Sequence, residues 1–258
     1  MKVLKEIYEY RQMIFSLVRK DLRGRYKGSI LGFLWTFIVP LMQLVVYTLV
    51  FSVILKSNIE KYYLFLFVAL IPWNFFSSAL TGGSTSVLHQ QNLVTKIYFP
   101  REVLPIANVT SSFVNMLYCF VVVLAVVLFS GFNLNLLAWL ALPLIMIIEY
   151  FMALGVAMLT SAVTVYFRDL EHILGIISMA WIHLTPVMYP IDIVPDEILP
   201  IFMLNPMTPI ISAYRDILYW GKFPDVTTLG SCVAFAAVFM ILGMVVFGRL
   251  KKRFAEEM

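Results

Sequence analysis

Glu149 is the one carboxyl that lies deep inside an apolar run, where an isolated charge requires a partner or a proton. Two interpretations stay open: a contact to a proton or substrate, or a structural carboxyl that faces other helices. The histidines His89, His172 and His183 are not at helical spacing from one another, and no H-E-x-x-H, paired-aspartate or G-x-S-x-G pattern is present. We therefore expect neither a catalytic site nor a metal site.

A nucleotide-binding loop of the form G-x-x-x-x-G-K-[ST], whose backbone amides cradle phosphates, is also missing. The nearest basic, glycine-containing segment is 23–29, Arg-Gly-Arg-Tyr-Lys-Gly-Ser, which lacks the required order and precedes an apolar run. If ATP drives this protein, another chain binds it, and this chain is not itself an enzyme.

The composition predicts an integral membrane protein. Hydrophobic residues make up 61% of the 258 positions and charged residues only 13%, against about 45–50% and about 25% in ordinary globular domains. So few charges cannot cover a water-exposed surface. The net charge of +4 comes from short basic blocks between apolar runs, which indicates membrane topology and not nucleic-acid binding.

Six apolar runs are candidates to cross the membrane, a distance that takes about 20 helical residues. We therefore predict an all-α membrane protein with six transmembrane helices, and the fifth is short because Pro186 and Pro190 interrupt its end. Proline-rich pieces between spans 5 and 6 predict short re-entrant outer helices. The predicted spans are 29–55, 62–80, 103–129, 136–165, 173–188 and 226–247.

The basic residues predict the orientation. Fifteen of the 19 lysines and arginines fall on one side of the predicted spans, which places both termini in the cytoplasm by the positive-inside rule. The opposite outer segment, residues 190–225, is rich in acids. Its carboxylates are Asp192, Asp196, Glu197, Asp216 and Asp225.

We treat residues 1–258 as one transmembrane domain with an N-terminal segment, 1–27, and a cytoplasmic tail, 248–258. Val3, Ile7, Tyr10, Ile14 and Leu17 recur at spacings of four and three residues, which predicts an amphipathic helix. The helix could lie along an anionic leaflet or could pack on a partner. Three bases suited to lipid head groups follow it: Arg23, Arg25 and Lys27.

Two loops on the predicted cytoplasmic side combine aromatic and charged residues. Residues 92–102 place Ile97, Tyr98 and Phe99 beside Lys96, Arg101 and Glu102, and residues 166–171 repeat the theme. Exposed aromatics and arginines are typical anchors of protein interfaces, so each loop could dock a soluble partner. Each could equally be a membrane-surface turn with aromatic anchors.

Four separated motifs resemble the polysaccharide and polyol-phosphate export permeases of the ATP-binding-cassette superfamily. They are Lys-Asp-Leu-Arg-Gly-Arg-Tyr-Lys-Gly-Ser-Ile-Leu-Gly at 20–32 with Trp35 and Pro40, Lys-Ile-Tyr-Phe-Pro-Arg-Glu-Val-Leu-Pro at 96–105, Phe-Arg-Asp at 167–169, and Thr-Pro-Val-Met-Tyr-Pro at 185–190 with Leu-Asn-Pro at 204–206. The resemblance covers essentially the whole chain.

The resemblance implies a homodimer in the cytoplasmic membrane, with two copies of a cytoplasmic ATP-binding subunit that carries the ATP and Mg; the permease itself carries no cofactor. Residues 96–102 resemble the coupling helix that docks on the ATPase, and the turn after span 4 resembles a second contact. The implied coupling residues are Lys96, Tyr98, Phe99, Pro100, Arg101, Glu102, Arg168, Asp169 and Glu171. Residues 191–222 resemble an outer gate, for which we select Pro190, Asn205, Pro206, Tyr214 and Arg215.

The implied cargo is a glycan or polyol-phosphate chain on undecaprenyl diphosphate, such as O-antigen, capsule or teichoic acid. Sugars stack their C–H faces on aromatic rings, so we expect Trp35, Tyr47, Trp73 and Tyr189 along the path. Aromatic residues near span ends also form ordinary interfacial belts. Two other functions stay open: export of small amphipathic drugs or lipids, and an intramembrane glycan-modifying enzyme that uses Glu149 and His183.

Overall fold

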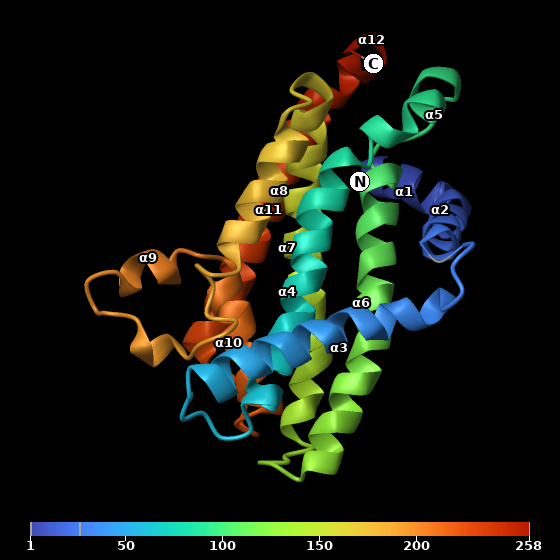
Figure 1. Ribbon diagram of the computed structural model, residues 1–258. Helices are drawn as coiled ribbons and strands as arrows, with labels where there is room; N and C mark the ends of the chain where they lie inside the picture. The colour runs from blue at the N-terminus through green and yellow to red at the C-terminus, as the bar shows by residue number, and fades with distance from the viewer. Residues whose placement is uncertain (1, 26, 258) are drawn as a thin grey trace.

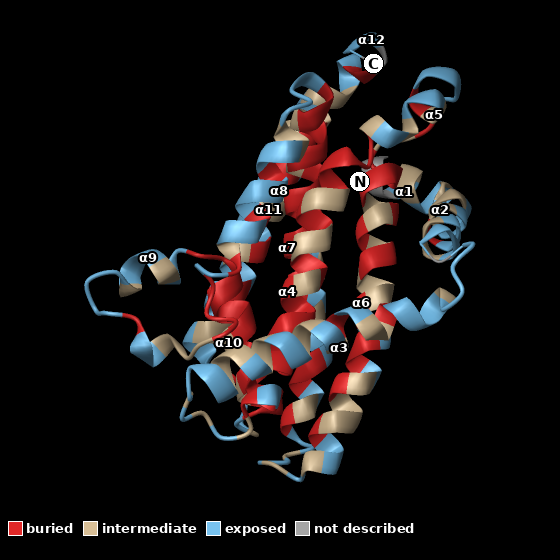
Figure 2. Cartoon of the chain, viewed as in Figure 1, coloured by how far each residue is buried: buried red, intermediate tan, exposed pale blue. Residues whose placement is uncertain are grey.

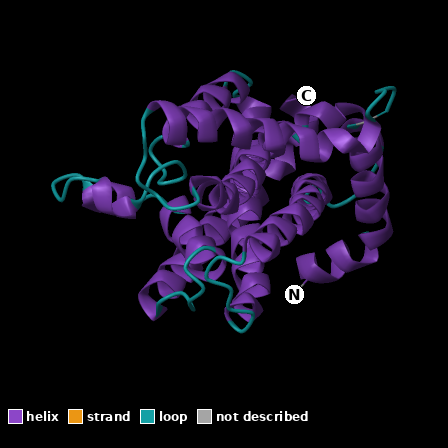
Figure 3. Ribbon diagram, turned by 60° about the horizontal axis from the view of Figure 1, so that its bottom comes forward, coloured by secondary structure: helices purple, strands orange, loops and turns teal. Residues whose placement is uncertain are grey.

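The computed structural model describes residues 2–25 and 27–257, and within these ranges it contains helices and loops but no strand (Figure 3). Among the residues that the structure describes, five helical segments are long and apolar enough to cross a membrane. The predicted all-α membrane fold is therefore confirmed. These segments are Gly32–Ile54, Tyr62–Thr85, Val103–Ser130, Ala138–Tyr166 and Val226–Arg253.

The fifth predicted span differs from the structure. In place of a helix over 173–188, the chain forms α8 (Leu170–Trp181), whose 12 residues reach only roughly 18 Å. Turns follow through residue 188, because Pro186 cannot supply the backbone N–H that a continuing helix needs. Helix α8 is therefore too short to cross by itself, and the predicted count of six spans is not reproduced by length.

Two helices form the centre of the bundle: α4 (Tyr62–Thr85) and α7 (Leu142–Tyr166). In their apolar windows 78% and 61% of the residues are buried by other parts of the chain, against 17% in the segment that begins with α11 (Val226–Leu250). Figure 2 shows this contrast between a buried centre and exposed outer helices. Helix α6 (Val103–Ser130) packs on the opposite side of α4 from α8 (Figure 1).

Helices α7 and α11 make the most extensive helix contact in the chain, and glycines permit their close approach. A Cβ atom on Gly243 would lie 2.2 Å from the carbonyl oxygen of Gly155, and one on Gly155 would lie 2.4 Å from the backbone of Phe239. Small residues let helix backbones touch where lipid offers no hydrophobic driving force. The crossing therefore depends on the absence of both side chains.

The first candidate span is built from η1 (Gly32–Leu34), α3 (Trp35–Thr48) and the π-helical turn η2 (Leu49–Ile54). Helix α3 crosses in front of α4 and α6 at a steep angle and packs on both (Figure 1). Only 6% of its apolar window is buried. Its outer face therefore needs lipid or another chain as a cover.

The N-terminal segment forms two helices, α1 (Lys2–Glu9) and α2 (Arg11–Gly24), which meet at Tyr10. Val18 of α2 is buried, and Asp21 accepts a short hydrogen bond from Ser111 of α6. The predicted amphipathic character is confirmed, because α2 packs one face on α6 and exposes Arg19, Lys20 and Arg23 on the other.

Short elements gather at the two ends of the bundle. The end with both chain termini, here the basic end, carries η3 (Leu88–Gln90), α5 (Gln91–Lys96), η6 (Lys251–Arg253) and α12 (Phe254–Glu257). The opposite end, here the distal end, carries η4 (Ala138–Ala141), η5 (Ile191–Ile193), α9 (Leu199–Met203) and α10 (Met207–Leu218). The predicted short helices between the last two apolar segments are thus present.

Candidate coupling and gate sites

The loop after α5 is held by Arg101. Its guanidinium donates to the carbonyl oxygens of Val94 and Phe99, each at 2.9 Å, and to that of Ile97 at 3.3 Å. It also lies over the Phe99 ring, 5.1 Å from the centroid. Helix α5 itself ends at Lys96, so the helical part of this segment precedes the predicted residues 96–102. Arg101 therefore caps α5 and fixes the turn that follows it.

The predicted docking residues of the α5 loop differ in how far their side chains are exposed. Tyr98 is 89% exposed, and Lys96 is exposed beside it. The exposure predicted for Phe99 is wrong, because this ring is buried against the core; Pro100 is half-buried. Tyr98 is also held from the N-terminal segment, since the Tyr10 hydroxyl donates to its carbonyl oxygen at 3.4 Å.

Glu102 faces inward as well and forms a short ion pair with Lys251, just past the end of α11. Three residues later, Phe254 is fully buried between Phe247 and Tyr166. The Tyr166 hydroxyl donates to the Leu250 carbonyl at 2.9 Å. We call Glu102, Tyr166, Lys251 and Phe254 the tail clamp; it joins the α5 loop, α7 and α11. Residues 248–258 were predicted to form a cytoplasmic tail. The single aromatic residue Phe254 is the one feature of that segment that could have indicated packing against the bundle.

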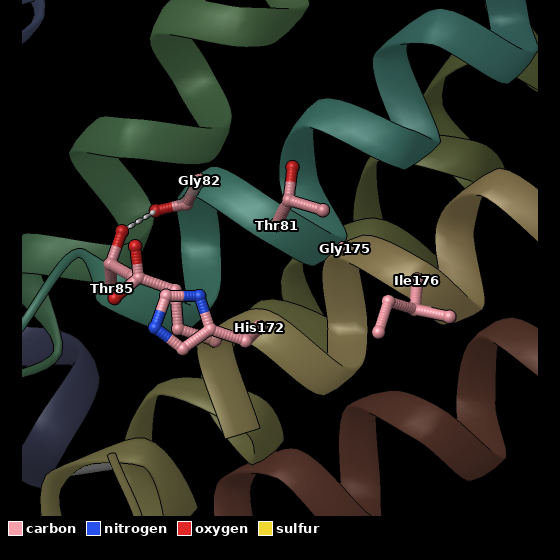
Figure 4. A pocket seen from close by; sticks show the side chains of 7 residues that line it. Thr81, Gly82, Thr85, His172, Gly175 and Ile176 are labelled. Carbon is pink, nitrogen blue, oxygen red and sulfur yellow. Dashed lines mark hydrogen bonds between the residues drawn. The ribbon is translucent and has the colours of Figure 1, made fainter. Parts of the chain in front are cut away.

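The turn between α7 and α8 exposes Arg168 and Asp169, whereas Glu171 is half-buried. Glu171 lines an open hollow of about 670 Å³ between α4 and α8. Figure 4 shows the His172 ring beside Thr85, with Thr81 on α4 and Ile176 on α8 farther along. The three predicted residues of this turn therefore face different surroundings.

At the distal end, Arg215 of α10 is buried and connects three segments. It donates to Phe65 of α4 at 3.4 Å, to Val187 at 2.6 Å and to Tyr189 at 3.4 Å, each through the carbonyl oxygen, and makes a shorter bond to Pro186. Within residues 2–25 and 27–257 it forms no ion pair. Its charge lies over the Phe65 ring at 3.5 Å.

Two further predicted gate residues are built into the same region. The Asn205 amide donates to the Leu184 carbonyl at 3.0 Å and to Thr185 Oγ1 at 2.8 Å, while its oxygen accepts from the Met207 N–H. Tyr214 donates to Glu149 Oε2 at 2.7 Å, and both residues are fully buried. The structure therefore places Asn205 and Arg215 against the loop that ends at Pro190, whereas Tyr214 faces α7, and Pro206 lies directly before α10.

A distal hollow of about 520 Å³ adjoins Arg215. Asp216 and Lys222 on its wall form an ion pair at 3.2 Å. Burial raises the pKa of the Asp216 carboxyl, and the hydrogen bond from Lys222 opposes that rise. Asp192 and Trp220 also line it, so the acidic segment 190–225 is partly neutralised where it meets α10.

The four predicted path aromatics have different environments. Trp35 is 41% exposed and donates to Ser29 Oγ at 3.0 Å, and Tyr47 is half-buried. Trp73 is buried inside the protomer, so its ring presents no face to cargo in this conformation. Tyr189 is half-buried and donates to the His183 carbonyl at 2.6 Å.

The three predicted head-group residues also differ. Arg23 and Lys27 are exposed. Arg25 instead pairs with Asp21 at 3.1 Å and donates to Ser112 of α6 at 3.2 Å. Arg25 therefore contributes to anchoring α2. The described part of the chain holds no group of three or more histidine, cysteine or acidic residues that could bind a metal.

Comparisons with known proteins place these features in a family. Residues 12–219 match the family described as ABC-2 type transporter. The chain is 34% identical to the O-antigen export system permease protein RfbA of Myxococcus xanthus over 99% of both chains, and 31% identical to the protein of the same name from Klebsiella pneumoniae over 95% and 94%. It is 23% identical to the capsule polysaccharide export inner-membrane protein CtrC of Neisseria meningitidis over 96% and 95%. The apolar helices, the clamped α5 loop and this similarity agree: the chain belongs to the ABC-2 type transporter membrane family.

Proposed function

We propose that the protein is the permease subunit of an ATP-driven exporter that moves a lipid-linked polysaccharide outward across the cytoplasmic membrane. The supporting observation is the similarity over nearly the whole chain to relatives named O-antigen export permeases, with capsule and polysialic acid transporters at lower identity. We infer a homodimer with two copies of an ATP-binding subunit. Undecaprenyl diphosphate is the lipid that we propose for the cargo.

We assign the basic end to the cytoplasm, because most lysines and arginines lie there. Both termini then face the ATP-binding subunit together with Tyr98, Arg168 and Asp169. The distal end, with Arg215 and the loop 182–206, faces outward and acts as the gate.

The tail clamp supplies a physical route for coupling. A movement of α5 that is driven by a docked ATPase acts on Glu102, and the ion pair between this buried carboxylate and the partly exposed Lys251 passes the movement to α11. Helix α11 contacts α7 along the glycine crossing, and α7 carries Glu149, which accepts from Tyr214 of the gate. Discrete packed elements of this kind can transmit a shift that flexible loops would absorb.

The enzyme alternative receives no geometric support. Glu149 is bonded to Tyr214, whereas His183 is exposed and bonds to Met179 of its own segment. The other alternative, an exporter of small amphipathic molecules, differs from the proposed function only in its cargo. A test of what the cell exports therefore distinguishes the two hypotheses.

We expect that deleting the gene removes a surface polysaccharide and that its lipid-linked precursor accumulates inside the cell. Complementation with Lys251→Glu should restore export poorly, because the buried Glu102 then faces a like charge. The double variant Lys251→Glu with Glu102→Lys should recover part of the activity. Surface polysaccharide is measured by immunoblot and precursor by mass spectrometry of extracted lipid.

Lys252→Glu is the matched control, since Lys252 is exposed and adjacent but outside the clamp. It should export normally. Normal surface polysaccharide in the deletion strain, accompanied by new drug sensitivity, would contradict the proposed cargo. Equal export by both single variants would contradict the clamp.

A further inference from the structure

A polar cavity of about 600 Å³ lies at the basic end between α2, α4 and α6. Its volume falls within the range of small-ligand sites, about 300–1,000 Å³. The fold supplies its wall from four elements, including η3. The polar side chains among its lining residues are Lys20, Asp21, Arg25, Thr85, Ser86, His89, Gln90 and Asn108.

The charge in this cavity is unbalanced. Asp21 is its one carboxylate, and that group is already bound by Arg25 and Ser111. Lys20 and His89 are exposed at the cavity and have no hydrogen-bond or ion-pair partner within residues 2–25 and 27–257. The side-chain nitrogens of Lys20 and His89 can therefore donate hydrogen bonds to a ligand, and the nearby Asp21 is already paired. This arrangement favours binding of an anion, and phosphate oxygens accept such hydrogen bonds well.

The inner wall holds an unsatisfied acceptor. Asn108 Oδ1 is buried and has no hydrogen-bond partner. It lies against the glycine pair of α4, because a Cβ on Gly82 would be 3.7 Å away from it. A buried polar atom of this kind costs free energy unless a group from outside the protomer supplies a donor. A hydroxyl-bearing ligand would supply one.

Position adds a third constraint. The cavity opens beside α2, whose exposed basic face and buried apolar face suit the membrane interface. We propose that it binds a sugar phosphate head group, with Lys20 and His89 on the phosphate and Asn108 on a sugar hydroxyl. The choice of a lipid-linked sugar as ligand rests on the proposed function; the anion site itself rests on the cavity.

Isothermal titration of the full chain in phosphatidylcholine nanodiscs tests the site. The probes are citronellyl diphosphate, the same molecule with N-acetylglucosamine attached, and inorganic diphosphate. We expect the sugar-bearing probe to bind tightest. Lys20→Gln and His89→Gln should each weaken it about tenfold, the effect of losing one charge-assisted hydrogen bond of roughly 1.4 kcal/mol.

Arg19→Gln removes a positive charge from the neighbouring exposed position of α2, outside the cavity, and should change affinity less than twofold. Asn108→Ala should abolish the preference for the sugar-bearing probe; a thermal unfolding scan reports whether it folds. Equal affinity for inorganic diphosphate supports the anion site and identifies a free anion as its ligand. Unchanged binding in Lys20→Gln, or an equal loss in Arg19→Gln, overturns the site.

The two proposals fail separately. If the wild-type chain restores surface polysaccharide but binds none of the probes, the cavity assignment fails and the proposed function stands. If the chain binds the probes but its deletion leaves every surface polysaccharide intact, the proposed function fails and the anion site stands.

Discussion

Arg215 shows how one side chain can organise a membrane protein's outer segment. A buried guanidinium without a carboxylate partner would be costly, but its planar fork offers five donors in fixed directions. Here the donors reach carbonyls on α4 and on the loop 186–189, whose proline-broken backbone leaves those oxygens free of helical bonds. The arginine therefore replaces the hydrogen bonds that a continued helix would have made.

Arg215→Lys should retain the charge and still loosen the gate. One ammonium cannot reach the four carbonyls of Phe65, Pro186, Val187 and Tyr189 together, and each buried carbonyl left unpaired costs about 1–3 kcal/mol. We expect a lower unfolding temperature and faster proteolysis within 190–206. Lys222→Gln, which breaks the pair between the exposed Lys222 and the half-buried Asp216, should change stability by less than about 1 kcal/mol. Comparable losses in both variants would contradict this role for Arg215.

At the scale of elements, the α7–α11 crossing and the tail clamp make one connected path from the α5 loop to the gate. Both depend on close contact: backbone against backbone at Gly155 and Gly243, and an ion pair between the buried Glu102 and the partly exposed Lys251. The helices at such contacts cannot separate by small continuous steps, because close-packed interiors tolerate neither voids nor atomic overlap.

Gly243→Ala should separate α7 from α11. The new methyl carbon would lie 2.2 Å from the Gly155 carbonyl oxygen, and that atom belongs to helix backbone and cannot move aside. We expect a loss of about 1–3 kcal/mol in stability, measured as unfolding in detergent. Gly230→Ala on the same helix meets nothing within 4 Å and should be neutral or slightly stabilising. A harmless Gly243→Ala would refute the crossing.

At the scale of the whole molecule, the helices on the outside of the bundle expose apolar surface. Helix α3 is the extreme case, with Met42, Val45 and Val46 more than half exposed. Lipid can cover such a surface. However, Trp35 and Tyr47 on the same helix are candidates for lining a sugar path, and a single helix cannot enclose a path without a second protein surface opposite it. A second copy of the chain against α3 satisfies both conditions.

Cysteine crosslinking in native membranes tests that dimer. In a background with Cys119→Ala and Cys232→Ala, Met42→Cys should form a species of twice the subunit mass on oxidation. Ile241 on α11 is 57% exposed, as against 54% for Met42, and Ile241→Cys should stay monomeric because the proposed dimer leaves α11 outside the interface. If Ile241→Cys forms dimers and Met42→Cys does not, the predicted interface on α3 is contradicted.

The sequence was sufficient for the class of protein and for most helix positions, since lipid allows only long apolar helices with satisfied backbones. Five predicted spans match helices within a few residues at most of their ends. The predicted fifth span, 173–188, is not reproduced as one helix: the prolines predicted a short span, but the end of α8 at Trp181, five residues before Pro186, was not predicted. Coupling residues were harder: Tyr98 and Phe99 are adjacent aromatics, yet one faces outward and the other is buried.

What the sequence determined by itself is therefore a helical membrane protein with one basic end and an acidic segment before its last apolar run, to which the loop motifs add a resemblance to export permeases. Composition and charge placement suffice for that, because they are local properties summed along the chain. The tertiary structure alone decided that Arg101 and Glu102 bind within the protomer, that Phe254 anchors the tail, and that Asn108 lines a cavity with Lys20 and His89. These outcomes depend on contacts between residues far apart in the chain, and no local pattern specifies which partners will meet.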